Sequence, residues 1–367
     1  MENNKQNAYD KSELFKRVEN FTGLNPDEAV SMFADSDCAT EHLTDVAAAL
    51  KRDIFSESVT IAASIQVEGA KSFEAEIKRA AECGHKRLHI KLSGDIDKDR
   101  EAVSSAAKQF DEDHCGCIEL GAQSFDAGLN DLHELGAELC FANISAGFER
   151  GDVQNSFANV KAAGYKLIGL DIELSGDPAA ALRQTLELCA ESEGQPDKLY
   201  IAGIRVCPAS NTDKAALIRF CALLAISLPF AKIGIELGTT NDVVDFAKAG
   251  VSLVYLSGEA IKALDDVVKR LTDAHILSGL CAACVACDRY SGEYADLCAD
   301  KQLYNYCYLN SLISLREFVA DHASRETRIA ATDLILNRLY GIGNKQIRDQ
   351  LALAMKQIRG GERGFRF

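Results

Sequence analysis

Short apolar segments alternate with amphipathic segments along most of this chain, and this alternation constrains the fold more than any other feature. Each pair takes up roughly 25–35 residues, the size of one strand–helix repeat. The first apolar segment, residues 59–67, is rich in β-branched side chains, and residues 72–83 follow with helical periodicity before Gly84. Further strands are predicted at residues 87–92, 117–122, 138–144, 167–174, 200–207, 231–237 and 252–256.

A helical crossover between successive strands makes those strands parallel, and about eight such units close into a barrel. A Rossmann sheet fits less well, because no G-x-G-x-x-G follows the first strand. We therefore predict an α/β fold with a (β/α)₈ TIM-type barrel over residues 58–273. A helical lead-in is expected over residues 1–57, and a C-terminal helical extension over residues 274–367.

Composition and charge exclude some classes of protein for this chain. Hydrophobic residues make up 47% and charged residues 26%, as in ordinary globular proteins. No apolar run approaches ~18 residues and the N-terminus is polar, so we expect a cytoplasmic protein that does not enter a membrane. The net charge is 40 − 55 = −15, which argues against nucleic-acid binding. From Ile276 onward the balance is 12 − 10 = +2, whereas the remainder carries 28 − 45 = −17, so the C-terminal part is a distinct module.

Polar residues occur near the carboxyl ends of the predicted strands, where barrel enzymes carry their chemistry. They are Lys91, Glu119, Gln123, Asn143, Asp171, Glu173, Arg205 and Glu236. The candidates for acid, base or anchoring roles are Glu119, Asp171, Glu173 and Arg205. In the alternative interpretation several of them pair with one another, Arg205 with a carboxylate for example, because an unpaired buried polar group is costly.

Cysteine spacing gives the strongest chemical signal. Of the 13 cysteines, five fall within residues 281–307: Cys281, Cys284, Cys287, Cys298 and Cys307. Cys281 and Cys284 form C-x₂-C, a spacing with which two thiolates grip one metal centre. Four cysteine ligands would indicate zinc or a fully ligated cluster, and three would leave one iron of a [4Fe–4S] cluster open. Disulfides are not expected in a cytoplasmic chain.

The last quarter of the chain resembles the C-terminal domain of the HydG family, the radical-SAM tyrosine lyases that mature the [FeFe]-hydrogenase H-cluster. The family pattern C-x₂-C-x₂₂-C is met by Cys281, Cys284 and Cys307. Further matches lie at residues 291–293, 306–307, 310, 315–318, 321–327 and 361–363, with thinner ones in the barrel at 93–95 and 205–209. The resemblance implies an auxiliary cluster held by those three cysteines, with Cys287 and Cys298 as extra thiols or a replacement ligand.

The chain departs from the family where the radical chemistry would begin. That chemistry requires C-x₃-C-x₂-C after the first strand, and no cysteine occurs between Cys38 and Cys83. We therefore expect no SAM cluster and no tyrosine lyase activity.

Three functions follow from these observations. The first is a non-radical scaffold or carrier whose [4Fe–4S] cluster binds cysteine, cyanide or a CO-like ligand on its open iron, with maturation proteins as possible partners. The second is an enzyme that uses the open iron as a Lewis acid, in dehydration or desulfuration. The third is a structural zinc site on an inert barrel, with Cys287 or Cys298 as the fourth ligand.

Overall fold

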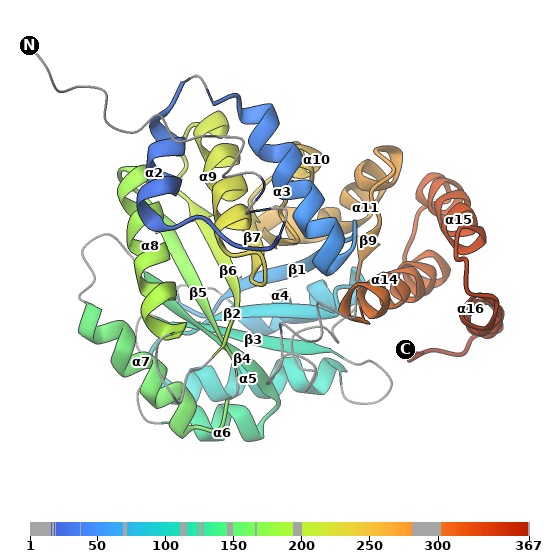
Figure 1. The fold of residues 1–367 in the computed structure, drawn as a ribbon. Helices are drawn as coiled ribbons and strands as arrows, with labels where there is room; N and C mark the ends of the chain where they lie inside the picture. Colours follow the sequence, from blue (N-terminus) through green and yellow to red (C-terminus); the bar gives the residue numbers. More distant parts are fainter. Residues whose placement is uncertain are drawn as a thin grey trace, which may run out of the picture.

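Eight parallel strands close into a barrel in the computed structural model of this chain (Figure 1). The structure describes residues 16, 18, 20–36, 38–68, 72–110, 116–122, 125, 128–144, 150–165, 167–193, 200–280 and 302–365. β1 pairs with both β2 and β8, and this double pairing closes the sheet. The predicted (β/α)₈ TIM-type fold is confirmed.

The barrel strands and their helices follow one another in strict alternation. The strands are β1 (Val59–Gln66), β2 (Arg87–Lys91), β3 (Cys117–Ala122), β4 (Ala137–Ile144), β5 (Leu167–Leu174), β6 (Tyr200–Pro208), β7 (Lys232–Leu237) and β8 (Leu253–Ser257). The helices are α4 (Phe73–Glu82), α5 (Ile96–Phe110), α6 (Leu129–Glu134), α7 (Arg150–Ala162), α8 (Pro178–Glu193), α9 (Lys214–Ser227), α10 (Val243–Lys248), the 3₁₀ helix η1 (Gly258–Ala263) and α11 (Leu264–Asp273).

The strand sequences are apolar in runs because both faces of the sheet are buried. All residues of β1 except Gln66 are buried, by the barrel interior on one side and by helices on the other. The helix end predicted at Gly84 is confirmed, and α10 ends in the same way at Gly250. Gly84 and Gly250 follow α4 and α10 with φ of +94° and +86°, a conformation that glycine adopts without strain.

The N-terminal lead-in packs against the outside of the barrel beside α8 and α9 (Figure 1). It contains α2 (Pro26–Ala34) and α3 (Thr40–Phe55). Asn25 and Glu28 cap α2 reciprocally, each side chain accepting the other's main-chain N–H at 3.0 Å. Arg219 on α9 donates to the carbonyls of Phe33 and Cys38 at 3.0 and 2.6 Å, which ties the α2–α3 connection to the barrel.

The C-terminal module packs near the N-terminal end of β1. It comprises β9 (Ser278–Gly279), α14 (Gln302–Asp321), α15 (Arg325–Tyr340) and α16 (Lys345–Arg359). β9 pairs with Val59 and Thr60, the first residues of β1, and α14 contacts α3. The N–H of Leu280 donates to Ser314 Oγ on α14 at 3.0 Å. The module therefore joins the end of the barrel that lies opposite the carboxyl ends of the strands. Across the described residues, no helix is long and apolar enough to cross a membrane.

Candidate functional site

A network of buried charges fills the barrel interior, and Arg205 of β6 is its centre. Arg205 donates from Nε and Nη2 to the two carboxylate oxygens of Asp171 at 2.8 and 2.7 Å. Its Nη1 also donates to Glu236 at 2.8 Å and to Ser64 at 2.9 Å. The bidentate pair with Asp171, together with the second carboxylate and the hydroxyl, fixes the guanidinium by hydrogen bonds that it donates to three strands.

His89 extends the network toward the start of the strands. Its Nε2 lies 3.3 Å from Asp171 Oδ2, and its Nδ1 lies 3.7 Å from Glu119 Oε2. Glu119 Oε1 is 3.3 Å from Arg87 Nε, and Glu119 Oε2 accepts a hydrogen bond from Tyr255 at 3.0 Å. The chain of contacts thus links β2, β3, β5 and β8 across the interior.

Strand periodicity explains why these side chains meet. Arg87, His89 and Lys91 alternate along β2 and so share its inward face. The barrel register sets His89 beside Ser64 of β1 and Glu119 of β3. Asp171 and Arg205 are register partners on the neighbouring strands β5 and β6, and closure brings this pair across the interior to His89 and Ser64, so the polar residues form a layer inside the barrel.

The local electrostatics hold the carboxylates of Asp171 and Glu236 in their ionised form. Burial alone would raise the pKa of Asp171, but the charges of Arg205 and His89 outweigh it and hold that pKa well below its usual range. Glu236 behaves in the same way: burial opposes ionisation, and Arg205 and Lys91 lower its pKa. Burial, reinforced by Glu119, raises the pKa of Tyr255 well above its usual value, so this phenol remains a proton donor.

A cavity of about 370 Å³ opens at the carboxyl ends of the strands, next to this network. Lys91, at the end of β2, lines it and pairs with Glu236 at 3.0 Å. Asn143 and Glu173 line it from β4 and β5, and Asn143 donates to Glu173 at 2.9 Å. Asp99 holds the turn after β2 by accepting the N–H of Ser93 at 2.8 Å. The cavity is polar and presents both signs of charge.

The four predicted acid, base or anchoring residues separate into two groups. Asp171 and Arg205 are directly paired, as the alternative interpretation of the sequence anticipated, and Glu119 joins them through His89. Glu173 is exposed at the cavity. The sequence analysis missed Arg87, His89 and Tyr255. The alternation of three basic residues in β2 was the signal that could have found the first two.

The cysteines that the structure describes do not form a metal site. Seven free thiols are present, at Cys38, Cys83, Cys117, Cys140, Cys189, Cys207 and Cys221. Burial raises the pKa of Cys207 and of Cys221 to about 12, so these side chains stay protonated, whereas metals bind the thiolate. Within the described ranges, no group of three or more His, Cys, Asp or Glu side chains is arranged to hold a metal ion.

The predicted cluster ligands fall largely outside the described residues. Cys281, Cys284, Cys287 and Cys298 lie outside them, as does Gln123. Cys307 belongs to the described backbone of α14, but its side chain is not described. Leu280 directly precedes Cys281, and its N–H donates a hydrogen bond to Ser314 on α14. This bond holds the residue before the cysteine segment against the helix that contains Cys307.

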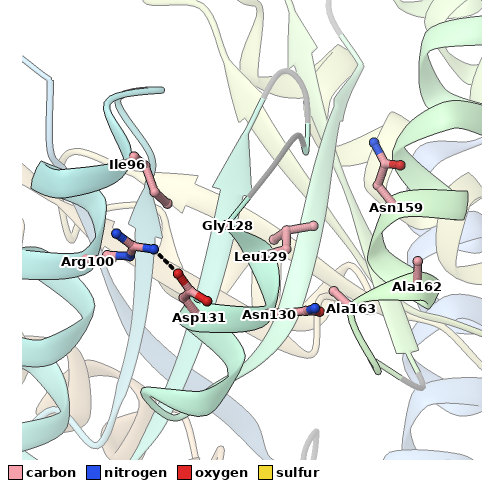
Figure 2. Close-up of a pocket in the computed structure, with 9 residues that line it drawn as sticks. All are labelled: Ile96, Arg100, Gly128, Leu129, Asn130, Asp131, Asn159, Ala162 and Ala163. Atoms are coloured by element: carbon pink, nitrogen blue, oxygen red, sulfur yellow. Dashed lines mark hydrogen bonds and ion pairs between the residues drawn. The ribbon is translucent and has the colours of Figure 1, made fainter.

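A second cavity, of about 640 Å³, lies outside the barrel between α5, α6 and α7 (Figure 2). Arg100 and Asp131 line it and pair with each other, as the dashed line in Figure 2 shows. The remaining lining is neutral, with Leu129, Asn130 and Asn159 among its members. Since its two charged lining groups neutralise each other, this groove is a weaker ligand site than the cavity at the strand ends.

Comparison with known proteins identifies the fold. Neither a protein-family model nor a curated protein sequence matches the chain. Among solved structures, HydG, a maturase of the [FeFe]-hydrogenase, superposes with a TM-score of 0.84 at 16% identity over 99% of this chain and 96% of that one. HydG from Carboxydothermus hydrogenoformans gives a TM-score of 0.71 at 17% identity over 94% and 93%. Methylornithine synthase (PylB) gives 0.56 at 15% identity over 78% of this chain and 99% of that one.

The chain therefore has a HydG-like fold over nearly its whole length. This confirms the fold that the sequence resemblance implied. At these identities the likeness extends to the fold alone, so its chemistry must be argued from this chain's own residues.

Proposed function

We propose that this protein is a non-radical iron–sulfur scaffold or carrier in metallocofactor maturation of the hydrogenase type. In this proposal Cys281, Cys284 and Cys307 hold one [4Fe–4S] cluster, and its fourth iron binds a small ligand such as cysteine, cyanide or carbon monoxide. The observation that carries the proposal is the C-x₂-C-x₂₂-C spacing in a chain with a HydG-like fold. The open iron supplies a coordination site for the ligand.

The backbone around the segment supports a shared site. Leu280, next to Cys281, is hydrogen-bonded to Ser314 on α14. Cys307 precedes Ser314 by seven residues on the same helix, an axial distance of about 10 Å at the α-helical rise. Three residue steps, as from Cys281 to Cys284, can reach about 10 Å at most, a span that would keep the three thiolates within reach of one cluster.

The connection after β1 supports the absence of radical chemistry. Only residues 67–72 separate β1 from α4, and none of these six residues is a cysteine. A C-x₃-C-x₂-C loop needs about eight residues to supply three thiolates to one iron–sulfur cluster. We therefore propose that the protein lacks a SAM cluster and does not generate a radical.

One observation favours the carrier over an enzyme that uses the open iron with the barrel's carboxylates. Leu280 lies near the start of β1, whereas Glu173 lies near the carboxyl end of β5. The six residue steps from Thr60 to Gln66 alone span about 20 Å along the strand. Asp171 and Arg205 are also committed to each other, which leaves them poorly suited to reach a cluster at the opposite end.

Anaerobic iron and sulfide analysis with EPR of the reduced protein tests this proposal. We expect about four irons and four sulfides per chain. Cys284→Ala and Cys307→Ala should each lose the cluster, whereas Cys83→Ala, which removes a thiol outside the segment, should retain it. Adding cyanide to the wild type should shift the EPR spectrum, because an open iron accepts the ligand.

The alternatives give different results in the same experiment. Zinc in place of iron would support the structural site and contradict the carrier. Loss of iron in Cys287→Ala, together with no spectral change on adding cyanide, would mean a fully ligated cluster without an open iron. Turnover of a hydroxy acid or a thiol by the purified protein, lost in Cys307→Ala, would support the enzyme.

A further inference from the structure

Four arginines of the C-terminal module converge near the end of α14. They are Arg316 on α14, Arg328 on α15, Arg359 at the end of α16, and Arg363 in the segment that follows α16. This last segment folds back onto α14. Arg363 Nε donates to Asp321 at 2.6 Å, and the N–H of Gly364 donates to Glu317 at 3.0 Å.

Arg328 and Arg359 approach the same place from the other two helices. Arg328 donates from Nη2 to the carbonyl of Ala323, two residues after α14 ends, at 3.2 Å. Arg359 follows Ile358, whose carbonyl accepts a hydrogen bond from Arg363 at 2.7 Å. Since α14 packs against both α15 and α16, the arginines surround one stretch of α14.

Arg316 lies within this group and has only positive neighbours acting on it. Burial, and then the charges of Arg359, Arg363 and Arg328, lower the pKa of Arg316 from its ordinary value. The side chain is half-buried and makes no hydrogen bond or ion pair with any residue that the structure describes. Like charges gathered in this way repel one another, and a bound anion would remove that cost.

The carboxylates beside the cluster are already paired. Asp321 binds Arg363, and this contact holds the pKa of Asp321 below its usual range. Glu317 pairs with Lys86, the residue before β2, and also accepts the N–H of Gly364. Three guanidinium groups therefore have no carboxylate partner among the described residues: those of Arg316, Arg328 and Arg359.

A structural role explains only part of this arrangement. A cation at the C-terminus of a helix is stabilised by the helix dipole, which accounts for Arg359. Arg316 lies five residues before the end of α14, outside its last turn, where the dipole has little effect. Elsewhere in the module an exposed cation has an acidic partner, as Lys345 has in Asp349 at 2.6 Å. The cluster is the exception, and what it lacks is an anion.

We propose that Arg316, Arg328 and Arg359 bind a phosphate or diphosphate group where α14, α15 and α16 meet. A guanidinium group donates two parallel hydrogen bonds to phosphate oxygens and stays protonated at physiological pH. Three such groups match an anion with several negative charges better than they match a single carboxylate. The half-burial of Arg316 favours a small anion over the surface of an acidic protein.

Isothermal titration calorimetry with pyrophosphate at low salt tests the proposal on the full-length protein. We expect one site per chain. Arg359→Gln changes an exposed side chain and should weaken binding by at least about tenfold, because a charge-assisted pair is lost. Lys345→Gln is the matched control. It removes one positive charge at the other end of α16, about 20 Å from Arg359, so affinity should stay within about twofold.

Further arms define the ligand. Arg316→Lys keeps the charge but cannot donate two parallel hydrogen bonds, so pyrophosphate affinity should fall several-fold. ADP binding as tight as pyrophosphate would support the proposal with a phosphate ester as ligand, and pyrophosphate binding alone would support it with the free anion. The Cys284→Ala/Cys307→Ala double variant should bind pyrophosphate like the wild type, because the site does not include the proposed cluster.

Two results would overturn the proposal. Equal weakening in Arg359→Gln and Lys345→Gln would show a general attraction of anions to a basic surface. Absence of pyrophosphate and ADP binding at low salt would show that the cluster is not a phosphate site. If poly-glutamate then bound to the wild type but not to Arg359→Gln, the cluster would be a docking site for an acidic protein instead.

Discussion

Two buried cations of this protein, Arg205 inside the barrel and Lys51 at its N-terminal end, differ in how their charge is compensated. Toward the carboxyl ends of the strands, Arg205 is bound by Asp171 and Glu236, and Lys91 completes the pairing. At the N-terminal end Lys51 is also buried, yet it has a cationic neighbour and no ion pair among the described residues. Paired charges of this kind fix one arrangement of side chains, whereas a buried amine without an ion pair lowers stability.

The C-terminal module joins this second end. β9 extends the sheet beside the first residues of β1, and Leu280 binds α14. The cysteine segment starts from there, so the proposed cluster belongs to the same end of the barrel as Lys51. The cavity at the strand ends, by contrast, lies beside charges that are already satisfied.

The largest effect is expected at the paired end. Asp171→Ala leaves Arg205 buried with one of its two carboxylate partners missing, and this should lower the free energy of unfolding by about 3–5 kcal/mol. Urea denaturation followed by circular dichroism measures the loss. Glu173→Ala is the matched control. Because Glu173 is exposed and makes a single hydrogen bond to Asn143, its loss should stay within about 0.5 kcal/mol. If Asp171→Ala and Glu173→Ala lowered the free energy of unfolding equally, the buried ion pair of Asp171 would contribute no more than the exposed carboxylate of Glu173.

A gain of stability is expected at the unpaired end. The pKa of Lys51 is about 7 in the folded protein and 10.5 when exposed, so the unfolded chain binds more protons between these values. Stability from this group therefore rises as pH increases from 7 to 10. Since one pKa unit corresponds to about 1.4 kcal/mol, Lys51→Met should stabilise the protein at pH 7 by at least about 1 kcal/mol.

Thermal unfolding across this pH range tests that expectation. The difference between Lys51→Met and wild type should shrink steadily as pH rises toward 10. Lys78→Met, at an exposed lysine of α4, should show no such trend. A destabilised Lys51→Met protein with a flat profile would mean that the amine has a stabilising partner.

The smallest effect is expected where the module contacts the lead-in. Arg338 on α15 pairs with Glu57 at 2.7 Å, and both side chains are about 30% exposed. A pair of this exposure contributes about 0–1 kcal/mol, so Arg338→Met should change the midpoint of urea denaturation only slightly. The loss should diminish further in 1 M salt. A loss above 2 kcal/mol would show that this pair holds the module to the barrel.

The sequence by itself determined the alternation of elements. The strand and helix bounds agree with those expected to within a few residues, because apolar periodicity and helix-ending glycines are local signals. It also determined the C-x₂-C-x₂₂-C spacing and the absence of a second cysteine motif.

Only the tertiary structure decided which charges meet. His89 comes between Glu119 and Asp171 because closure of the barrel brings β2, β3 and β5 around one interior, and no local pattern encodes that closure. The two-residue strand β9 is too short to give a periodic signal, yet it fixes where the C-terminal module joins. Lys51 looks like an ordinary helix lysine in the sequence, and its burial beside Lys232 arises only when α3 packs against the end of the barrel.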